Sequence, residues 1–174
     1  AGEKFYVKKG ATAAHVRNEL LAASLYQLAG SPVLDYVPVK GGNHVATKMQ
    51  KLEKNNVAKL SPAEIKAMQD QFAVHAWLSN YDAAGTGGDN QGVVNGVVTT
   101  LDVGGSLEYR AQGKPKGDAF GDKVLEFDTM RDPKISPDAA RVFGKMTDAQ
   151  IAEAVLLYES GAVRGVTELG QRYG

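Results

Sequence analysis

Residues 80–105 read NYDAAGTGGDNQGVVNGVVTTLDVGG. Within them, Asn95-Gly96 separates two runs rich in valine and threonine, and such a pair is the strongest short-range signal for a tight β-hairpin. Because a closed hairpin brings its two ends together, we expect Asp82, Asn90 and Asp102 to surround one small volume.

These three side chains suit a magnesium ion bound to a polyphosphate. Mg²⁺ prefers hard oxygen ligands and takes only a few of them from protein. Each of the three residues taken alone is equally a turn former, since Asp and Asn are common in turns. Their placement at both ends of one hairpin favours a site for phosphoryl transfer.

Composition limits the classes of function. The 174 residues suit one domain or a compact two-lobed unit. Lys plus Arg and Asp plus Glu number 20 each, and this balance predicts no nucleic-acid partner. No apolar run has the length of a membrane span. The absence of cysteine excludes a disulfide scaffold, a thiolate zinc site and a cysteine nucleophile, and the three histidines lack zinc-binding spacing.

The composition also bears on where the protein works. No signal-type start is visible, so we predict a cytoplasmic protein. An exported effector or a virion-associated protein would have the same composition.

The remaining sequence predicts an α+β protein. Strands are expected over residues 5–9, 32–39 and 44–49, and helices over 12–28, 61–78, 136–143, 147–159 and 163–173. Residues 50–59 read as a connection, and 107–128 as mostly loop with short strands. This order predicts a small sheet-containing unit over residues 1–52 and a mainly helical unit over 53–174.

Two helices have predicted buried faces. In the helix over residues 12–28 this face consists of Val16, Leu20, Leu21 and Leu28. In the helix that begins at the capping box Ser61–Glu64 it includes Ile65, Met68, Phe72 and Trp77. A second capping box, Thr147–Gln150, marks the start of a later helix.

The order of elements resembles the protein-kinase-like superfamily, specifically its atypical branch of phosphatidylinositol kinases and HipA-like kinases, including bacterial or phage-encoded members. Tyr6-Val7-Lys8 is similar to the strand that carries the ATP-phosphate lysine of that family. Residues 15–22, HVRNELLA, resemble the following helix, whose glutamate pairs with that lysine and would here be Glu19.

The catalytic part of the family has matching segments as well. Asn80-Tyr81-Asp82 resembles the start of its catalytic loop and Asp89-Asn90 the metal-binding end of that loop. Asp102-Val103-Gly104 stands where the family has its second metal-binding aspartate in a D-x-G motif. The resemblance covers residues 5–110.

The resemblance implies a two-lobed kinase-like fold and an ATP- and Mg²⁺-dependent phosphotransferase. It assigns catalysis to Asp82, nucleotide binding to Lys8, Glu19 and Met49, and metal binding to Asn90, Asp102 and Asp89. A protein hydroxyl is the expected acceptor rather than a lipid, because no basic membrane-facing patch or amphipathic lipid-contact helix is evident.

The chain departs from the family pattern in two places. Asp82 and Asn90 are eight residues apart, whereas the family spacing is about five, so Asp89 is the rival catalytic base. Few residues precede Phe5, which leaves no room for the glycine-rich hairpin that covers the phosphates; either the first strands were removed from a longer protein, or we expect nucleotide binding to be weakened.

These departures leave two alternatives open. One is a catalytically inactive kinase-like module with a structural or binding role in a larger bacterial or phage assembly. The other is transfer of a nucleotidyl group instead of phosphate.

Overall fold

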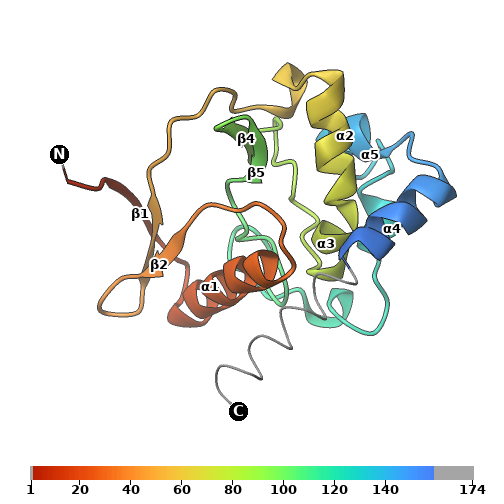
Figure 1. Ribbon diagram of the computed structural model, residues 1–174. Helices are drawn as coiled ribbons and strands as arrows, with labels where there is room; N and C mark the ends of the chain where they lie inside the picture. The colour runs from red at the N-terminus through yellow and green to blue at the C-terminus, as the bar shows by residue number, and fades with distance from the viewer. Residues whose placement is uncertain (1, 159–174) are drawn as a thin grey trace, which may run out of the picture.

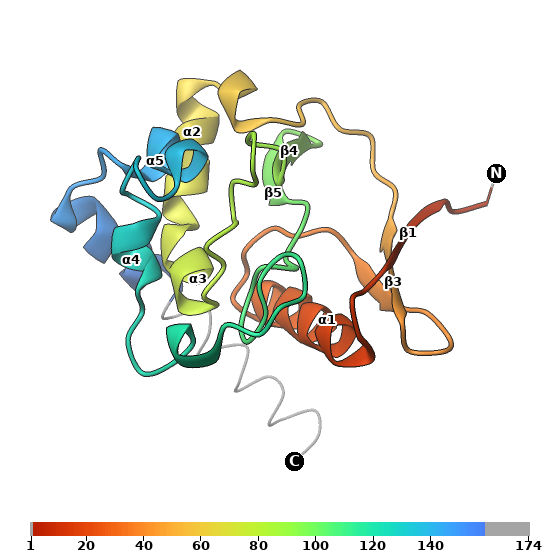
Figure 2. The same ribbon diagram turned by 180° about the vertical axis from the view of Figure 1, so that it is seen from behind.

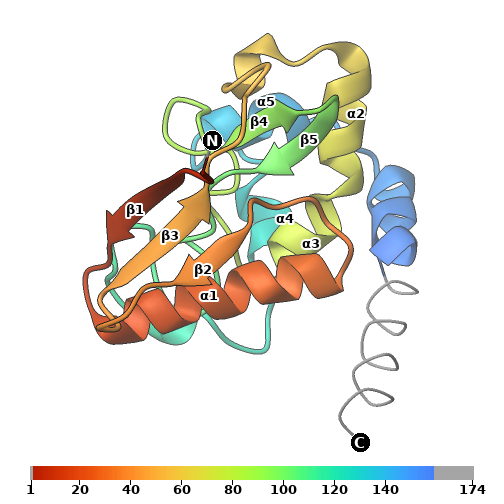
Figure 3. The ribbon, with the colours of Figure 1, turned by 60° about the vertical axis from the view of Figure 1, so that its left-hand side comes forward.

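The computed structural model describes residues 2–158, which form an α+β protein as predicted. Its N-terminal part is a three-stranded antiparallel sheet with the strand order β1-β3-β2. The strands are β1 (Phe5–Lys9), β2 (Tyr36–Pro38) and β3 (His44–Lys48), and α1 (Ala13–Leu28) follows β1 in the chain. Figure 3 shows α1 lying alongside this sheet.

The C-terminal part is mainly helical. It contains the 3₁₀ helices η1 (Val57–Lys59) and η2 (Gly117–Ala119), the hairpin β4 (Gln91–Val94) and β5 (Val97–Thr100), and the helices α2 (Pro62–Asp70), α3 (Phe72–Trp77), α4 (Glu126–Thr129) and α5 (Pro137–Phe143). Residues 148–158 are also helical. In Figures 1 and 2 helices α2 to α5 gather at one end of the molecule, and the hairpin lies between them and the sheet.

Strand β1 faces the candidate site through alternate residues. Tyr6 pairs with Thr47 and Lys8 with Val45, and paired residues share a face of the sheet. The strand predicted over residues 32–39 is shorter than expected, because only its Tyr36–Pro38 portion joins β3. Upstream of that portion, Val33 forms a parallel bridge with Thr100 of the hairpin.

The predicted helix over residues 61–78 is interrupted. It forms two helices, α2 and α3, with a break at Gln71. The buried Gln71 side chain donates through Nε2 to Val98 O of the hairpin at 3.1 Å. Both predicted capping boxes are present, at Ser61–Glu64 and at Thr147–Gln150.

Two apolar clusters hold the elements together. The larger packs α2, α3 and α5 against the hairpin, and Phe72 stacks on Phe143 with ring centroids 4.5 Å apart. The second cluster joins α1 to α3 through Tyr26, Val74 and neighbouring residues, and it includes Val103. The sheet-containing part and the helical part therefore share a core, which fixes α1 relative to the segment after the hairpin.

For two residues the prediction of burial is wrong. Leu21 and Trp77 each expose 54% of their surface, although Val16, Met68 and Phe72 are buried as predicted. The buried face of α1 consists largely of small and polar residues. Its polar members His15 and Asn18 can be buried because they form hydrogen bonds with residues 104–108. In α3 residues 72–76 are all buried, and only Trp77, the last residue of the helix, is exposed.

The segment 107–128 also differs from its prediction. In place of short strands it contains one isolated bridge between Tyr109 and Pro115, the 3₁₀ helix η2 and the start of α4. The helix predicted over 163–173 lies outside the described residues. Within residues 2–158, none of the helices combines the length and the apolar character that a membrane crossing requires.

Candidate functional site

The hairpin forms as predicted. Val94 pairs with Val97, and Asn95 and Gly96 occupy the turn with φ of 50° and 77°. Positive φ at both positions is what a tight I′-type turn requires. Leu101 N donates to Asn90 O at 2.9 Å, so the two ends of the hairpin are closed together.

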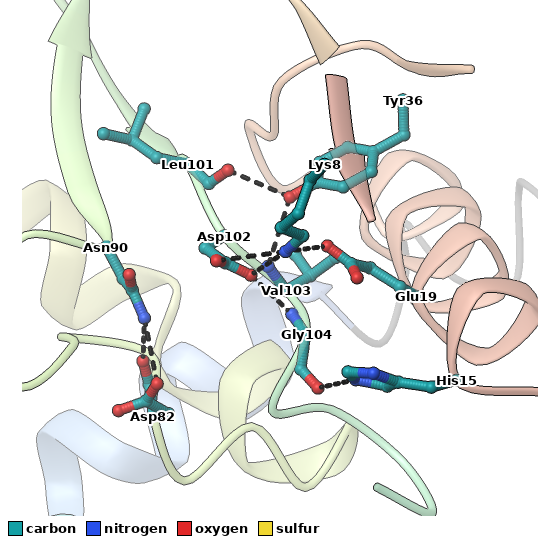
Figure 4. Close-up of polar contacts among 10 residues, drawn as sticks. All are labelled: Lys8, His15, Glu19, Tyr36, Asp82, Asn90, Leu101, Asp102, Val103 and Gly104. Atoms are coloured by element: carbon teal, nitrogen blue, oxygen red, sulfur yellow. Dashed lines mark hydrogen bonds and ion pairs between the residues drawn. The ribbon is translucent and has the colours of Figure 1, made fainter. Parts of the chain in front are cut away.

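Asp82 and Asn90 are in direct contact despite their long spacing. Asn90 Nδ2 donates to Asp82 O at 2.8 Å and to Asp82 Oδ2 at 3.1 Å (Figure 4). The intervening loop turns sharply at Gly85, which has φ of 82°. A Cβ atom at this position would lie 2.6 Å from Asp89 Oδ1, so the loop needs glycine here.

Lys8 connects the sheet, α1 and the end of the hairpin. Its Nζ lies 2.5 Å from Glu19 Oε1 and 3.2 Å from Asp102 Oδ2. Burial lowers the pKa of Lys8, but Asp102 and Glu19 together more than offset this effect, so its pKa is raised. Burial raises the pKa of the fully buried Glu19 carboxyl, and Lys8 opposes that shift.

The D-x-G segment is held from both sides. Gly104 N donates to Asp102 Oδ1 at 2.8 Å, which fixes the carboxylate against its own turn. Tyr36 donates its hydroxyl to Leu101 O at 2.9 Å and accepts from Val103 N at 3.3 Å. A Cβ atom at Gly105 would lie 3.0 Å from Asp82 Cβ, so this glycine permits the segment to approach the loop that carries Asp82.

The two groups of side chains lie next to each other. In Figure 4 Asp102 stands between the Lys8–Glu19 pair and the Asp82–Asn90 pair. Asp82 and Asp102 interact through charge: burial, then Asp102 and then Asp89 raise the pKa of Asp82 to about 6, against the opposing hydrogen bond from Asn90. A carboxylate with a pKa close to neutrality can accept a proton efficiently at pH 7.

A small pocket of about 100 Å³ contains the lysine end of the site. It lies between one face of the sheet and the exit of the hairpin, and its lining includes Tyr6, Lys8, Glu19, Thr47 and Asp102. Met49, in contrast, follows β3, exposes 58% of its surface and does not line this pocket.

A second pocket of about 280 Å³ has Asp82 in its lining. The glycine-rich loop and the start of α5 form its walls, and Asp138 Oδ2 accepts from Gly87 N at 2.9 Å to join them. Ile135 and Tyr81 contribute apolar surface. None of the described lining residues is Lys or Arg.

Sequence reasoning missed several residues that position the site. His15 Nε2 lies 3.1 Å from Gly104 O, and Asn18 bonds Ser106 O and Glu108 N. Their signal in the sequence is that His15, Asn18 and Glu19 are polar and share one helical face at i, i+3 and i+4.

A buried hydrogen-bond network holds the residues just before Asp82. The Tyr26 hydroxyl accepts from Asn80 Nδ2 at 3.0 Å and lies 2.7 Å from His75 Nδ1. Burial lowers the pKa of His75 to about 3, so the ring is neutral. The network connects α1 and α3 to the residue two positions before Asp82.

The side-chain oxygens of Asn90 and Asp102 could supply only part of the ligand set of a hard cation. In the described part of the chain, no three His, Asp or Glu side chains are grouped closely enough to hold a metal ion by themselves. Asn90 uses its Nδ2 on Asp82, which directs its oxygen elsewhere, and the Asp102 side chain is 42% exposed. An amide and a carboxylate oxygen fit Mg²⁺, which takes its remaining ligands from water and phosphate.

No family model matches this chain, and a search of curated proteins gave no significant match.

Proposed function

We propose that the chain is an ATP- and Mg²⁺-dependent phosphotransferase with a two-lobed, kinase-like arrangement, the small lobe being residues 1–52 and the larger 53–174. One observation carries the proposal: Lys8 contacts both Glu19 and Asp102, directly beside the Asp82–Asn90 pair. Phosphoryl transfer needs a phosphate-binding cation, metal-binding oxygens and a group that orients the acceptor, all within one site.

Lys8, Asn90 and Asp102 would serve the nucleotide. The Lys8 ammonium would bind the α- and β-phosphates, and the buried Glu19 carboxylate holds it in place from α1. The Asn90 amide oxygen and the Asp102 carboxylate would bind Mg²⁺. When bound, Mg²⁺ would supply positive charge that offsets the negative charge of the phosphates.

Asp82 would serve the acceptor. The acceptor oxygen forms a bond to the γ-phosphorus, the bond from that phosphorus to ADP breaks, and the hydroxyl proton passes to the Asp82 carboxylate. The raised pKa of Asp82, about 6, suits this proton transfer. Asn90 anchors Asp82, whereas Asp89 is exposed on the loop, so Asp82 is the better candidate for the base.

The pocket beside Asp82 supports a protein hydroxyl as the acceptor. Its volume of about 280 Å³ is just below the usual range for ligand pockets, which begins at about 300 Å³, and suits a single side chain. Its described lining carries the carboxylates of Asp82 and Asp138 and no basic side chain. A phosphorylated lipid or sugar would meet like charge there, whereas a serine or threonine side chain would not.

The test is transfer of labelled phosphate. The purified chain is incubated with Mg²⁺ and ATP labelled at the γ-phosphate, and in parallel with ATP labelled at the α-phosphate, together with itself and a panel of protein acceptors. The proposal expects γ-label on protein, loss of transfer in EDTA and loss of transfer in Asp82→Asn. Incorporation of the α-label would show nucleotidyl transfer instead, and absence of both labels from every acceptor would refute a transferase.

One observation favours a second candidate, a non-catalytic module that binds a partner. The edge strand β1 exposes Phe5, Tyr6 and Val7, by 41%, 63% and 53%. An exposed apolar edge is a template for strand addition by another chain. Under this alternative neither label is transferred, and Phe5→Glu and Val7→Glu, which place negative charge on the apolar edge, abolish partner binding without changing nucleotide binding.

A further inference from the structure

A strained turn leads directly into the catalytic loop. Ser79 has φ of 53°, in the left-handed region that a residue with a side chain seldom adopts. Opposite it, Leu107 has φ of 55° and donates its N–H to Leu78 O at 2.7 Å. Residues in this conformation persist only where the surrounding structure holds them.

Lys116 is placed to hold this turn. It is 7% exposed, and its Nζ donates to Ser79 O. The same ammonium lies 5.4 Å from the centroid of the Tyr81 ring, within the range of a cation–π interaction. Lys116 thus contacts the carbonyl of Ser79, three residues before Asp82, and the ring of Tyr81, one residue before it.

Other contacts tie the same two stretches together. The Tyr81 hydroxyl accepts from Ala111 N at 3.1 Å, and the Arg110 guanidinium lies 5.8 Å from the Tyr81 ring centroid. From the other side, Ser79 Oγ donates to Glu126 Oε1 of α4 at 2.5 Å. Residues 107–116 therefore form a strap across the turn that precedes Asp82.

We propose that Lys116 is a positioning residue for phosphoryl transfer, acting through the Ser79 carbonyl and the Tyr81 ring to fix the backbone that carries Asp82. This inference rests on the proposed function. In this proposal the segment after the D-x-G motif orders the catalytic loop through a buried ammonium group.

The charge of Lys116 gives the strap a pH dependence. Burial lowers the pKa of Lys116 to about 8; Glu126 on α4 raises it and Arg110 on the strap lowers it. The Tyr81 ring is the other group that faces the ammonium. Above about pH 8 the amine loses its proton, the bond to Ser79 O loses its charge assistance and the attraction to the ring disappears.

The test compares Lys116→Met with Lys114→Met, a matched control two residues away with an exposed side chain. We expect Lys116→Met to lower kcat for phosphate transfer about ten- to a hundredfold, since small misplacements of catalytic groups have effects of that size. Its Kd for Mg²⁺-ATP, measured by thermal shift, should stay within about threefold. Lys114→Met should match the wild type in both measurements.

Two further readouts separate positioning from a general loss of structure. Lys116→Arg stays charged at all pH values, so it should keep kcat and remove the loss of activity that the wild type shows above about pH 8. In hydrogen exchange without nucleotide, Lys116→Met should speed exchange of the Ala83 and Gly85 amides. These amides donate to Asn80 O and Asp82 O in the wild type. The hairpin amides should keep their protection.

The inference is overturned if Lys116→Met retains kcat, or if the alkaline limb is the same in Lys116→Arg as in the wild type. It is also overturned if exchange at residues 79–85 does not change. Wild-type protein with no transfer and no Mg²⁺-dependent nucleotide shift would refute the phosphotransferase instead, and the exchange measurement, which needs no nucleotide, would still decide whether Lys116 fixes the turn.

Discussion

Asp82→Asn should stabilise the nucleotide-free protein at alkaline pH and not at acid pH. In the folded protein the pKa of Asp82 is about 6, against an ordinary value of 3.8. Between these values the folded state keeps a proton that the unfolded chain has lost, so the free energy of unfolding falls as pH rises through this window. Asparagine is neutral at every pH and does not carry this cost.

The size of the effect follows from the shift. A difference of about two pH units corresponds to about 3 kcal/mol as an upper bound. Asp82 is only partly buried, and screening by solvent reduces this figure to about 1–2 kcal/mol. The asparagine can still accept the hydrogen bond from Asn90 through its amide oxygen. For a chain of this length we expect a rise in Tm of about 2–8 °C at pH 8 and no rise at pH 4.

The assay is thermal and urea unfolding at pH 4 and pH 8, in EDTA and without nucleotide. The wild type is compared with Asp82→Asn and with Asp122→Asn, which changes an exposed carboxylate in the same way. Equal shifts of Tm at the two pH values, or a lower Tm for Asp82→Asn at pH 8, would show that Asp82 carries no raised pKa. The assignment of Asp82 as a base tuned by burial would then fail.

Three other predictions concern the nucleotide side of the site. ATP should stabilise the wild type by up to about 2.7 kcal/mol at a hundredfold excess over Kd when Mg²⁺ is present and by much less in EDTA; equal thermal shifts in the two conditions would remove the metal from the proposal. Lys8→Ala and Glu19→Ala should each weaken Mg²⁺-ATP binding and, in a double-mutant cycle, deviate from additivity by at least about 1 kcal/mol, because they form one ion pair; additive effects would place Lys8 on the solvated surface. Asp102→Asn should lower both Mg²⁺-ATP affinity and phosphate transfer, whereas Asp82→Asn should lower transfer alone. Calorimetric titration measures the affinity beside the transfer assay, and a loss of affinity in Asp82→Asn but not in Asp102→Asn would contradict these roles.

Local chemistry in the sequence determined the hairpin and the helix starts. Asn95-Gly96 accepts positive φ at both turn positions, and the Ser61 and Glu64 side chains satisfy each other's backbone N–H groups at the start of α2. The approach of Asp82 to Asn90 also followed from the sequence, because hairpin closure and a glycine-rich loop are both local features.

Only the tertiary structure decided which distant groups meet. Lys8 and Asp102 are 94 residues apart, and their contact depends on the core that α1 and α3 share. The same core turned His15 and Asn18 inward and left Leu21 in solvent, since a helical pattern does not specify which polar side chains will find partners.

The burial of Lys116 in the strap could not be predicted from the sequence either. Lys116 reads as a surface lysine in a polar loop, and its burial depends on the Ser79 carbonyl and the Tyr81 ring, 37 and 35 residues away in the chain. A buried ammonium is stable only where acceptors from other segments replace its water. Periodicity and propensity describe neighbours along the chain, so the sequence could identify the candidate site residues. Their geometry was set by the packing of α1, the sheet and the strap.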